Sequence, residues 1–362
     1  MFIRKISCAR LQIPLVRPFI TALRRADYIE DIIVVIELEN GMLAYGGAAA
    51  TPAITGESPA SIIAAIQLLA AHLCGKDLRN FEELLQIINN SLVRNSSAKA
   101  ALDIAIHDAL AKYLQVPLYR LLGGGNPQIK ILATVSINSI PQMVSDAQLL
   151  VAHGFTTLKL KLGVNQLEDV QRVIAIRQAL GPDITIVTDA NQGWDAKAAL
   201  AVIDSLIEND LKISMVEQPV AAWDYANLAY VRANSRLPIY ADEAIFNVGD
   251  ALKIISGNLA DGINIKLMKS GGIHQARTIY DLASAHRLPC MAGCMLESPV
   301  SLTAMASFVA SRANFKFIDL DPITMISTNP VNGGVSLNAA TLTLSDAPGL
   351  GIEHISDLEF IS

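Results

Sequence analysis

The sequence predicts a barrel of eight parallel strands alternating with helices, preceded by a smaller unit of mixed strands and helices. Short apolar runs recur eight times after residue 125, about 24 to 29 residues apart, which is the length of one strand–helix unit. Stretches with helical periodicity, such as 167–180 and 273–286, lie between these runs. The runs begin near Ile131, Thr157, Ile184, Ile213, Pro238, Gly262, Leu288 and Phe315. This alternation is typical of a (β/α)8-type barrel.

The first part of the chain predicts an α+β unit. Residues 1–16 indicate a strand, and the β-branched run 32–38 followed by Asn40-Gly41 predicts a hairpin. Helical periodicity covers three further stretches, 61–73, 81–92 and 98–114. The run Gly123-Gly124-Gly125 then interrupts the chain. We therefore expect a capping unit over 1–125, a barrel over 126–330, and a tail over 331–362 that returns to the capping unit.

Composition excludes several classes of protein. The net charge of −6 lacks the basic surface of a nucleic-acid binder. The most apolar stretch, 61–73, is interrupted by Gln67 and is too short to span a membrane. The N-terminus has no long apolar core with a cleavage site, and the four cysteines form no CxxC pair, which together favour free thiols and a cytoplasmic location. The cysteines are Cys8, Cys74, Cys290 and Cys294.

Charged residues appear where most of the predicted strands end. The strands are otherwise apolar, and an unpaired charge inside such a strand would be costly to desolvate. The C-terminal ends of parallel barrel strands meet on one face, where active sites form, so we expect these charges to cluster there. They are Lys159, Lys161, Asp189, Glu217, Asp242, Lys266, Asp319 and Asp321.

Three of these residues predict a metal site. Asp189, Glu217 and Asp242 end three consecutive strands, and packed together their carboxylates would repel one another. A hard divalent cation resolves that repulsion, and oxygen-only ligands favour Mg2+, with Mn2+ as an alternative. Capping of the following helices is the competing interpretation for each acid taken alone.

The lysines predict proton transfer. Lys159 and Lys161 are two apart on a strand and so project to the same side, whereas Lys266 comes from strand six, across the barrel. A cation and a second lysine nearby should lower the pKa of a lysine and make it a base. Two such bases on opposite sides of a carbon can remove and return a proton. The alternative is that the lysines only neutralise the acids.

The acids of strand eight call for a cation of their own. Asp319 and Asp321 repeat the two-residue spacing, away from the three proposed metal ligands. The ammonium group of an amino-acid-like substrate would suit them. The alternative is one acid paired with a lysine and the other in solvent.

These motifs together resemble the enolase superfamily, in the muconate-lactonising-enzyme subgroup. The matching segments are Lys159-Leu160-Lys161, Thr188-Asp189-Ala190-Asn191, Glu217-Gln218-Pro219, Ala241-Asp242-Glu243 and 264–272. The resemblance covers nearly the whole chain. It implies a capping domain, completed by the C-terminal tail, over a modified (β/α)7β barrel that binds one Mg2+ per subunit. That superfamily combines a lysine or histidine base with one or two Mg2+ ions.

Within the subgroup the sequence is most similar to dipeptide epimerases, especially the L-Ala-D/L-Glu type. The acids at 319 and 321 match that family's binding site for the α-ammonium group, and 18–24 matches a mobile loop whose arginine, Arg24, reaches a Glu side chain. Thr134 and Cys294 align with substrate-contacting positions, and Lys159 is counted with them. One departure is Gly47, where many relatives have Glu.

The resemblance implies epimerisation at an α-carbon through an enediolate, with Lys161 and Lys266 transferring the proton. The alternatives are an epimerase for apolar or cationic dipeptides, or an N-acylamino-acid racemase, o-succinylbenzoate synthase or muconate cycloisomerase. A non-catalytic metal-binding barrel is the alternative of another class. The expected partners are a dipeptide and further copies of the chain, with neither nucleic acid nor membrane. Peptidoglycan recycling is the implied pathway; the sequence gives neither the preferred dipeptide nor the number of subunits.

Overall fold

The N-terminal unit is built on an antiparallel sheet that also includes the last strand of the chain. In the computed structural model, which describes residues 1–361, the order of this sheet is β17-β1-β2-β3. Its strands are β1 (Ile3–Ile20), β2 (Arg25–Leu38), β3 (Leu43–Ala49) and β17 (Glu359–Phe360). The turn between β2 and β3 contains Gly41 with a φ of +81°, so the hairpin predicted from Asn40-Gly41 is confirmed.

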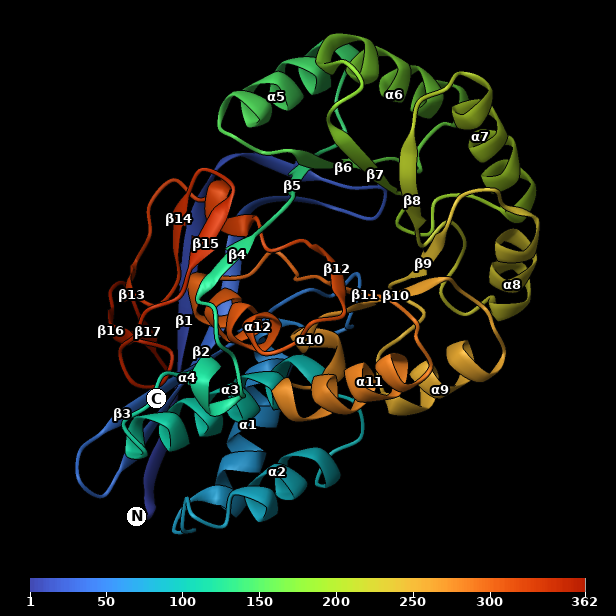
Figure 1. Ribbon diagram of the computed structural model, residues 1–362. Helices are drawn as coiled ribbons and strands as arrows, with labels where there is room; N and C mark the ends of the chain where they lie inside the picture. The colour runs from blue at the N-terminus through green and yellow to red at the C-terminus, as the bar shows by residue number, and fades with distance from the viewer. Residues whose placement is uncertain (362) are drawn as a thin grey trace.

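The two faces of this sheet pack against different cores because side chains alternate along each strand. Ile32, Val34 and Ile36 point into an apolar core shared with three helices. Ile33 and Val35 point the other way and join the large core of the barrel. The helices are α1 (Pro59–Leu73), α2 (Phe81–Asn90) and α3 (Ser96–Tyr113), which confirm the three predicted stretches and lie below the ring of strands in Figure 1.

The eight apolar runs form one parallel sheet with the order β12-β11-β10-β9-β8-β7-β6-β5. The strands are β5 (Ala133–Val135), β6 (Thr157–Lys161), β7 (Thr185–Asp189), β8 (Ile213–Glu217), β9 (Ile239–Ala241), β10 (Gly262–Ile265), β11 (Cys290–Ala292) and β12 (Phe315–Ile318). The N–H of Leu132, beside β5, donates to the carbonyl of Ile318 at 2.9 Å. This bond links the two edges of the curled sheet, which appears as a ring in Figure 1.

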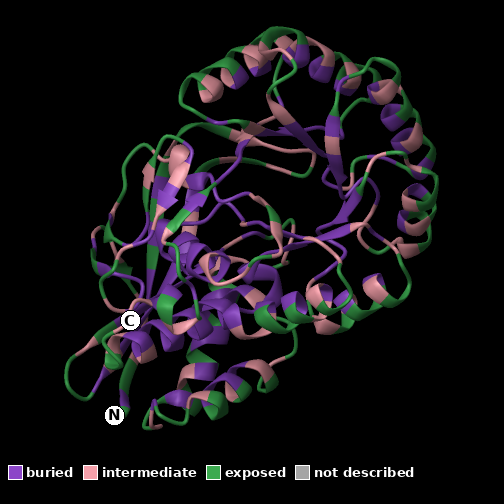
Figure 2. Cartoon of the chain, in the orientation of Figure 1, coloured by how far each residue is buried: buried purple, intermediate pink, exposed green. Residues whose placement is uncertain are grey.

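Helices surround this ring and follow every strand except the last. They are α5 (Ile140–Ala152), α6 (Gln166–Leu180), α7 (Ala196–Glu208), α8 (Tyr225–Asn234), α9 (Val248–Ser256), α10 (Leu267–Ser270), α11 (Ile273–Ala285) and α12 (Pro299–Ala310). β12 leads only into a short 3-10 turn, η1 (Pro322–Thr324). The fold is therefore a modified (β/α)7β barrel. The inner faces of most of these helices are buried and their outer faces exposed, whereas α10 and α12 are buried almost throughout (Figure 2).

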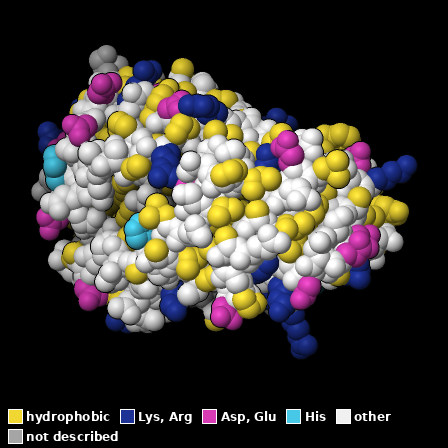
Figure 3. Space-filling model, turned by 90° about the horizontal axis from the view of Figure 1, so that it is seen from above, with side chains coloured by type: hydrophobic (Ala, Val, Ile, Leu, Met, Phe, Trp, Pro, Cys, Tyr) yellow, Lys and Arg dark blue, Asp and Glu magenta, His cyan; other side chains and the backbone are white. Residues whose placement is uncertain are grey.

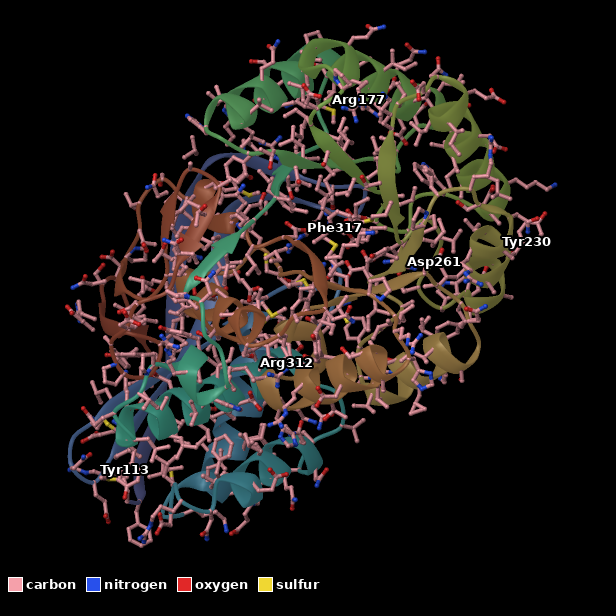
Figure 4. The ribbon with its side chains drawn as sticks, in the orientation of Figure 1. Tyr113, Arg177, Tyr230, Asp261, Arg312 and Phe317 are labelled. Carbon is pink, nitrogen blue, oxygen red and sulfur yellow. The ribbon has the colours of Figure 1, made fainter. Side chains whose placement is uncertain are left out.

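The interior of the barrel contains an apolar layer, and charged side chains lie directly above it. The apolar layer consists of Leu132, Val187, Met215, Tyr240, Met291 and Phe317. The ring of Phe317 points into the circle of strands in Figure 4. Side chains alternate along a strand, so the residues two positions further on face the same interior. On β7 to β9 and on β12 those residues are Asp189, Glu217, Asp242 and Asp319.

The C-terminal tail returns to the N-terminal unit, as predicted. β17 pairs with β1 through Ala9 and Phe360, and β14 (Ser336–Asn338) and β15 (Thr341–Thr343) form a sheet with β4 (Gln128–Lys130). β13 (Val331–Gly333) pairs with β16 (Ile352–Ile355), and the short helix α4 (Leu118–Leu121) completes the elements. The N–H of Leu350 donates to buried Asp108 of α3 at 2.7 Å, which ties the tail to the helices.

The molecular surface is mixed in charge. On the face seen in Figure 3, basic and acidic side chains are interspersed rather than gathered by sign. Among residues 1–361, every helix is too short or too polar to cross a lipid bilayer.

The close approach of β3 and α3 gives a test of the packing. A Cβ atom on Gly46 would lie 1.9 Å from the carbonyl oxygen of Ala101 in α3, so Gly46→Ala must push the helix off the sheet. We expect a loss of about 1–3 kcal/mol in the free energy of unfolding, measured by urea denaturation. Gly125→Ala, where a Cβ would meet open space, is the control and should change little. Equal stability of the two variants would contradict this packing.

Candidate active site

The predicted acids meet at the C-terminal ends of neighbouring strands. Asp189 and Glu217 are register partners on β7 and β8, and Lys161 is the register partner of Asp189 on β6. Asp242 directly follows β9. Its main-chain N–H donates to Oε1 of Gln218 at 2.8 Å, which fixes the turn that presents its carboxylate.

Asp189, Glu217 and Asp242 each offer a carboxylate oxygen within 4.8 Å of the other two, and all three are fully buried. Oε2 of Glu217 receives no hydrogen bond, although Lys159 Nζ lies 2.8 Å away. Burial and the charge of Asp189 raise the pKa of Glu217 to about 7. A compact set of buried oxygen ligands that repel one another fits a hard divalent cation.

The competing interpretation, in which these acids cap the helices, is wrong for this structure. The side chains that accept from the first N–H groups of the following helices belong to other residues. They are Asp195 for α7, Asp224 for α8 and Asn247 for α9. The three acids are therefore free to face the interior of the barrel.

Four buried lysines surround the acids. Lys161 Nζ lies 2.7 Å from Asp189, and Lys266 Nζ lies 2.6 Å from Asp242 on the other side of the group. Lys159 Nζ contacts Asp189 at 3.0 Å and Glu217 and Asp319 at 2.8 Å each. Lys269 Nζ lies 2.5 Å from the second oxygen of Asp242. The lysines do neutralise the acids, as the alternative interpretation held.

The pKa values of two of these lysines lie above their ordinary range in the protein alone, whereas the sequence predicts lowered values for lysines beside a bound cation. Burial lowers the pKa of Lys266, but the charge of Asp242 outweighs it and leaves that pKa above its ordinary range. Burial of Lys159 is likewise outweighed by Asp189, Asp319 and Glu217, so its pKa is well above the ordinary value. The physical reason is that negative charge surrounds these ammonium groups more closely than other lysines do.

Asp319 and Asp321 differ in their surroundings. Asp319 pairs with Lys159, as the alternative interpretation held, but Asp321 is buried rather than in solvent. Burial and the charge of Asp319 raise the pKa of Asp321 to about 7. Thr134 joins the pair, since its main-chain N–H donates to Asp321 and its hydroxyl donates to Asp319 at 3.4 Å. Cys294 Sγ donates to the main-chain oxygen of Asp319 at 3.2 Å.

A cleft opens above these groups, and its enclosed space measures about 50 Å³. Lys161 and Lys266 line it together with Thr134, Cys294, Asp319 and Asp321. Its upper wall comes from the capping unit, through Phe19, Thr21, Arg24 and Ile54. Of the predicted site residues, Lys159 and the three acids lie beneath this lining, and the other seven form it.

Arg24 and its neighbour Arg25 point in different directions. Arg25 is exposed and pairs with Asp27 at 3.1 Å, whereas Arg24 lines the cleft. Burial lowers the pKa of Arg24 to about 10, and its guanidinium has no carboxylate within salt-bridge distance among residues 1–361. The geometry thus leaves an unpaired cation facing the cleft.

Three residues of the site were not singled out by the sequence. Asn264 donates to Glu217 at 2.7 Å, Lys269 binds Asp242, and Asn191 donates to Glu243 at 3.1 Å. Asn264 lies two residues before Lys266, so the alternation that grouped Lys159 with Lys161 would have found it. Lys269 reaches the site from the helical turn α10, where that rule does not apply.

Comparison with known proteins covers the whole chain. Residues 5–123 match the family described as mandelate racemase / muconate lactonizing enzyme, N-terminal domain, and residues 142–358 match enolase C-terminal domain-like. An L-Ala-D/L-Glu epimerase of Clostridium acetobutylicum is 40% identical over 99% of this chain and 100% of its own length.

Solved structures agree with this grouping. A substrate-liganded complex of the L-Ala-D/L-Glu epimerase from Bacillus subtilis has a TM-score of 0.97 and 39% identity, over 98% of this chain and 100% of that one. A dipeptide epimerase from Enterococcus faecalis, complexed with Mg and the dipeptide L-Leu-L-Tyr, has a TM-score of 0.94 and 38% identity, with the same coverage.

The three-acid site is tested by Asp242→Asn. Losing one charged ligand should weaken Mg2+ binding on the order of 100-fold, measured by isothermal titration calorimetry. Circular dichroism checks that the variant is folded, because Lys266 and Lys269 lose their partner. Asp281→Asn removes the same charge from an exposed position on α11 and should bind Mg2+ normally. Unchanged affinity in Asp242→Asn would show that the cation binds elsewhere.

Proposed function

Because the chain belongs to the mandelate racemase / muconate lactonizing enzyme family, we propose that it is a dipeptide epimerase that requires Mg2+ and acts on L-Ala-D/L-Glu. It is an isomerase that inverts the α-carbon beside the terminal carboxylate. One observation supports this most. Lys161 and Lys266 reach the same cleft from β6 and β10, on the two sides of the three-acid group, while Asp319 and Asp321 border it from β12.

We assign Asp189, Glu217 and Asp242 as the ligands of one Mg2+. Their buried oxygen-only set and the raised pKa of Glu217 beside Asp189 support the assignment. When bound, Mg2+ supplies positive charge that stabilises the negative charge developing on the substrate carboxylate. The relative from Enterococcus faecalis was crystallised with Mg and a dipeptide. Mn2+, which has a similar preference for oxygen, is expected to substitute for it.

The proton transfer is assigned to the two lysines of the cleft. Lys161 removes the α-proton of one epimer, and Lys266 delivers a proton to the opposite face of the same carbon. For the reverse epimer the roles exchange. Lys159 lies beneath the cleft and keeps a fixed positive charge there, because three carboxylates surround it. That charge adds to the stabilisation of the deprotonated substrate.

The ammonium end of the dipeptide is assigned to Asp319 and Asp321. Asp319 is already paired with Lys159, so Asp321 is the acid whose charge remains to be matched. Thr134 and Cys294 contact this pair and are assigned as further substrate contacts. N-succinylated amino acids, which the alternative racemases use, carry no free ammonium and would leave Asp321 unmatched.

The side chain of the second residue is assigned to Arg24. An unpaired guanidinium in a cleft favours a carboxylate, which it can bind through two hydrogen bonds. This supports Glu rather than an apolar second residue. The Enterococcus faecalis structure contains L-Leu-L-Tyr, so preference for apolar dipeptides is the alternative within the family.

Four broader assignments, of domains, location, oligomeric state and pathway, complete the proposal. We propose the division into 1–125, 126–330 and 331–362, although β4 already pairs with the tail. A cytoplasmic location is proposed because Cys8, Cys74, Cys290 and Cys294 are all free thiols. We also propose that copies of the chain associate as a homo-oligomer. An L-Ala-D/L-Glu substrate would fit peptidoglycan recycling.

The two-base assignment predicts different behaviour of exchange and epimerisation. Lys161→Ala and Lys266→Ala should each lower epimerisation by about 100-fold or more, because each removes one proton-transferring group. In D2O each variant should still exchange the α-proton of one epimer, and the two variants should exchange opposite epimers, as measured by NMR. Lys197→Ala, on an exposed position of α7, is the control. Normal epimerisation by Lys266→Ala would remove it from the mechanism.

The assignment of Arg24 predicts a selective loss. Arg24→Ala should lower kcat/KM for L-Ala-L-Glu by roughly 10- to 100-fold, the cost of one charge-assisted contact of about 1.5–3 kcal/mol. L-Ala-L-Leu should be affected far less. Arg25→Ala is the matched control, because its guanidinium pairs with Asp27 outside the cleft. An equal loss for both dipeptides, or a wild-type preference for apolar or cationic second residues, would contradict the assignment to Glu.

A further inference from the structure

A buried acid of the capping sheet bonds to a loop of the barrel. Asp31 lies on the face of β2 that points toward the barrel and is fully buried. Its Oδ2 accepts the main-chain N–H of Ser298 at 2.8 Å. Ser298 precedes α12 and ends the loop 293–298, whose residues Met295 and Leu296 line the substrate cleft. Asp31 therefore connects the cap to one wall of the cleft.

The space beside Asp31 is left open by a glycine. Gly47 on β3 is the register partner of Ile33, so it shares the face of the sheet that carries Asp31. A Cβ atom on Gly47 would lie 3.6 Å from Oδ2 of Asp31 and 2.5 Å from the hydroxyl of Ser301. A longer side chain at position 47 would enter the space that the Asp31 carboxylate occupies.

The buried region around Asp31 already contains two carboxylates and offers them few hydrogen-bond partners. Oδ1 of Asp31, Oε2 of Glu297 and the hydroxyl of Ser301 are buried and have no hydrogen-bond partner, and neither carboxylate forms a salt bridge among residues 1–361. Burial raises the pKa of Asp31 to about 6, and burial together with Asp31 raises the pKa of Glu297, which favours its protonated form. A third carboxylate from position 47 would increase this repulsion. A carboxylate at position 31 therefore favours a small, uncharged residue at position 47.

We propose that Asp31 is a positioning residue that fixes the loop 293–298 against the cap, and that its carboxylate does from β2 what a Glu at position 47 would do from β3. Asp31 does not reach the substrate. It acts through the loop. Within that loop Oε1 of Glu297 accepts the N–H of Met295 at 3.2 Å, and Sγ of Cys294 donates to the main-chain oxygen of Asp319. Its role for catalysis rests on the proposed epimerase function.

The test is a cycle of variants that moves the carboxylate between strands. Asp31→Ser should raise KM for L-Ala-L-Glu by roughly tenfold, with a smaller change in kcat and an unchanged Kd for Mg2+, because the loss loosens the cleft wall and not the metal site. Hydrogen exchange of 293–298 should become faster. Asp31→Asn keeps an oxygen acceptor for Ser298 and should stay within about twofold of wild type. Glu30→Ser, on the same strand with a partly exposed side chain, is the control.

The double variant Asp31→Ser with Gly47→Glu should recover KM, loop exchange and melting temperature relative to Asp31→Ser alone. Gly47→Glu alone adds a third carboxylate and should lower the melting temperature. If that variant does not fold, the comparison of Asp31→Ser with the double variant still decides. Additive losses in the double variant, or unchanged loop exchange in Asp31→Ser, would overturn the proposal. Loop exchange and melting are read without substrate, so they stand even if wild type epimerises no dipeptide, a result that would refute only the proposed function.

Discussion

The site depends on the contacts that the ammonium group of Lys159 makes with three carboxylates. It lies within 3.0 Å of carboxylate oxygens from Asp189, Glu217 and Asp319, and so joins strands β6, β7, β8 and β12 at the centre of the barrel. Buried carboxylates are costly unless they are paired, and removing one partner from such a group leaves the others uncompensated. The apolar layer formed by Leu132, Val187, Met215, Tyr240, Met291 and Phe317 closes the barrel directly beneath. The charges can therefore be balanced only by the lysines, by a cation or by substrate, and this is what makes the site receptive to both Mg2+ and a zwitterionic ligand.

Buried carboxylates also join the capping unit to the barrel. There they accept main-chain N–H groups instead of pairing with lysines. Asp103 of α3 accepts from Ile273 at the start of α11 at 2.6 Å, and Asp31 accepts from Ser298 before α12 at 2.8 Å. Acids at helix starts are favourable because the N-terminal N–H groups lack partners within the helix. These contacts join the capping unit to the barrel, and the cleft is lined by residues of both units, among them Arg24 and Ile54 from the capping unit.

Much of this arrangement could be predicted from alternation along strands. Asp189, Glu217 and Asp242 each follow an inward apolar residue by two positions, so their convergence required only that the runs form parallel neighbours. Pairings between distant segments could not be predicted in the same way. The sequence does not show that Lys159 contacts Asp319, a contact that contributes to the raised pKa of this lysine. Nor does it show that Gly47 lies beside Asp31, a relation that depends on the register of β2 and β3 and on the position of α12.

We conclude that the chain inverts an α-carbon by proton transfer next to a carboxylate in the presence of Mg2+. In the most direct test, wild-type protein is incubated with a library of dipeptides in D2O, either with Mg2+ or with a chelator. Deuterium at the α-carbon is then measured by mass spectrometry. We expect one deuteron at the α-carbon of the C-terminal residue of L-Ala-L-Glu, accompanied by formation of L-Ala-D-Glu, with Mg2+ and not with the chelator. Absence of exchange for every dipeptide, or faster turnover of N-succinyl amino acids than of any dipeptide, would contradict it.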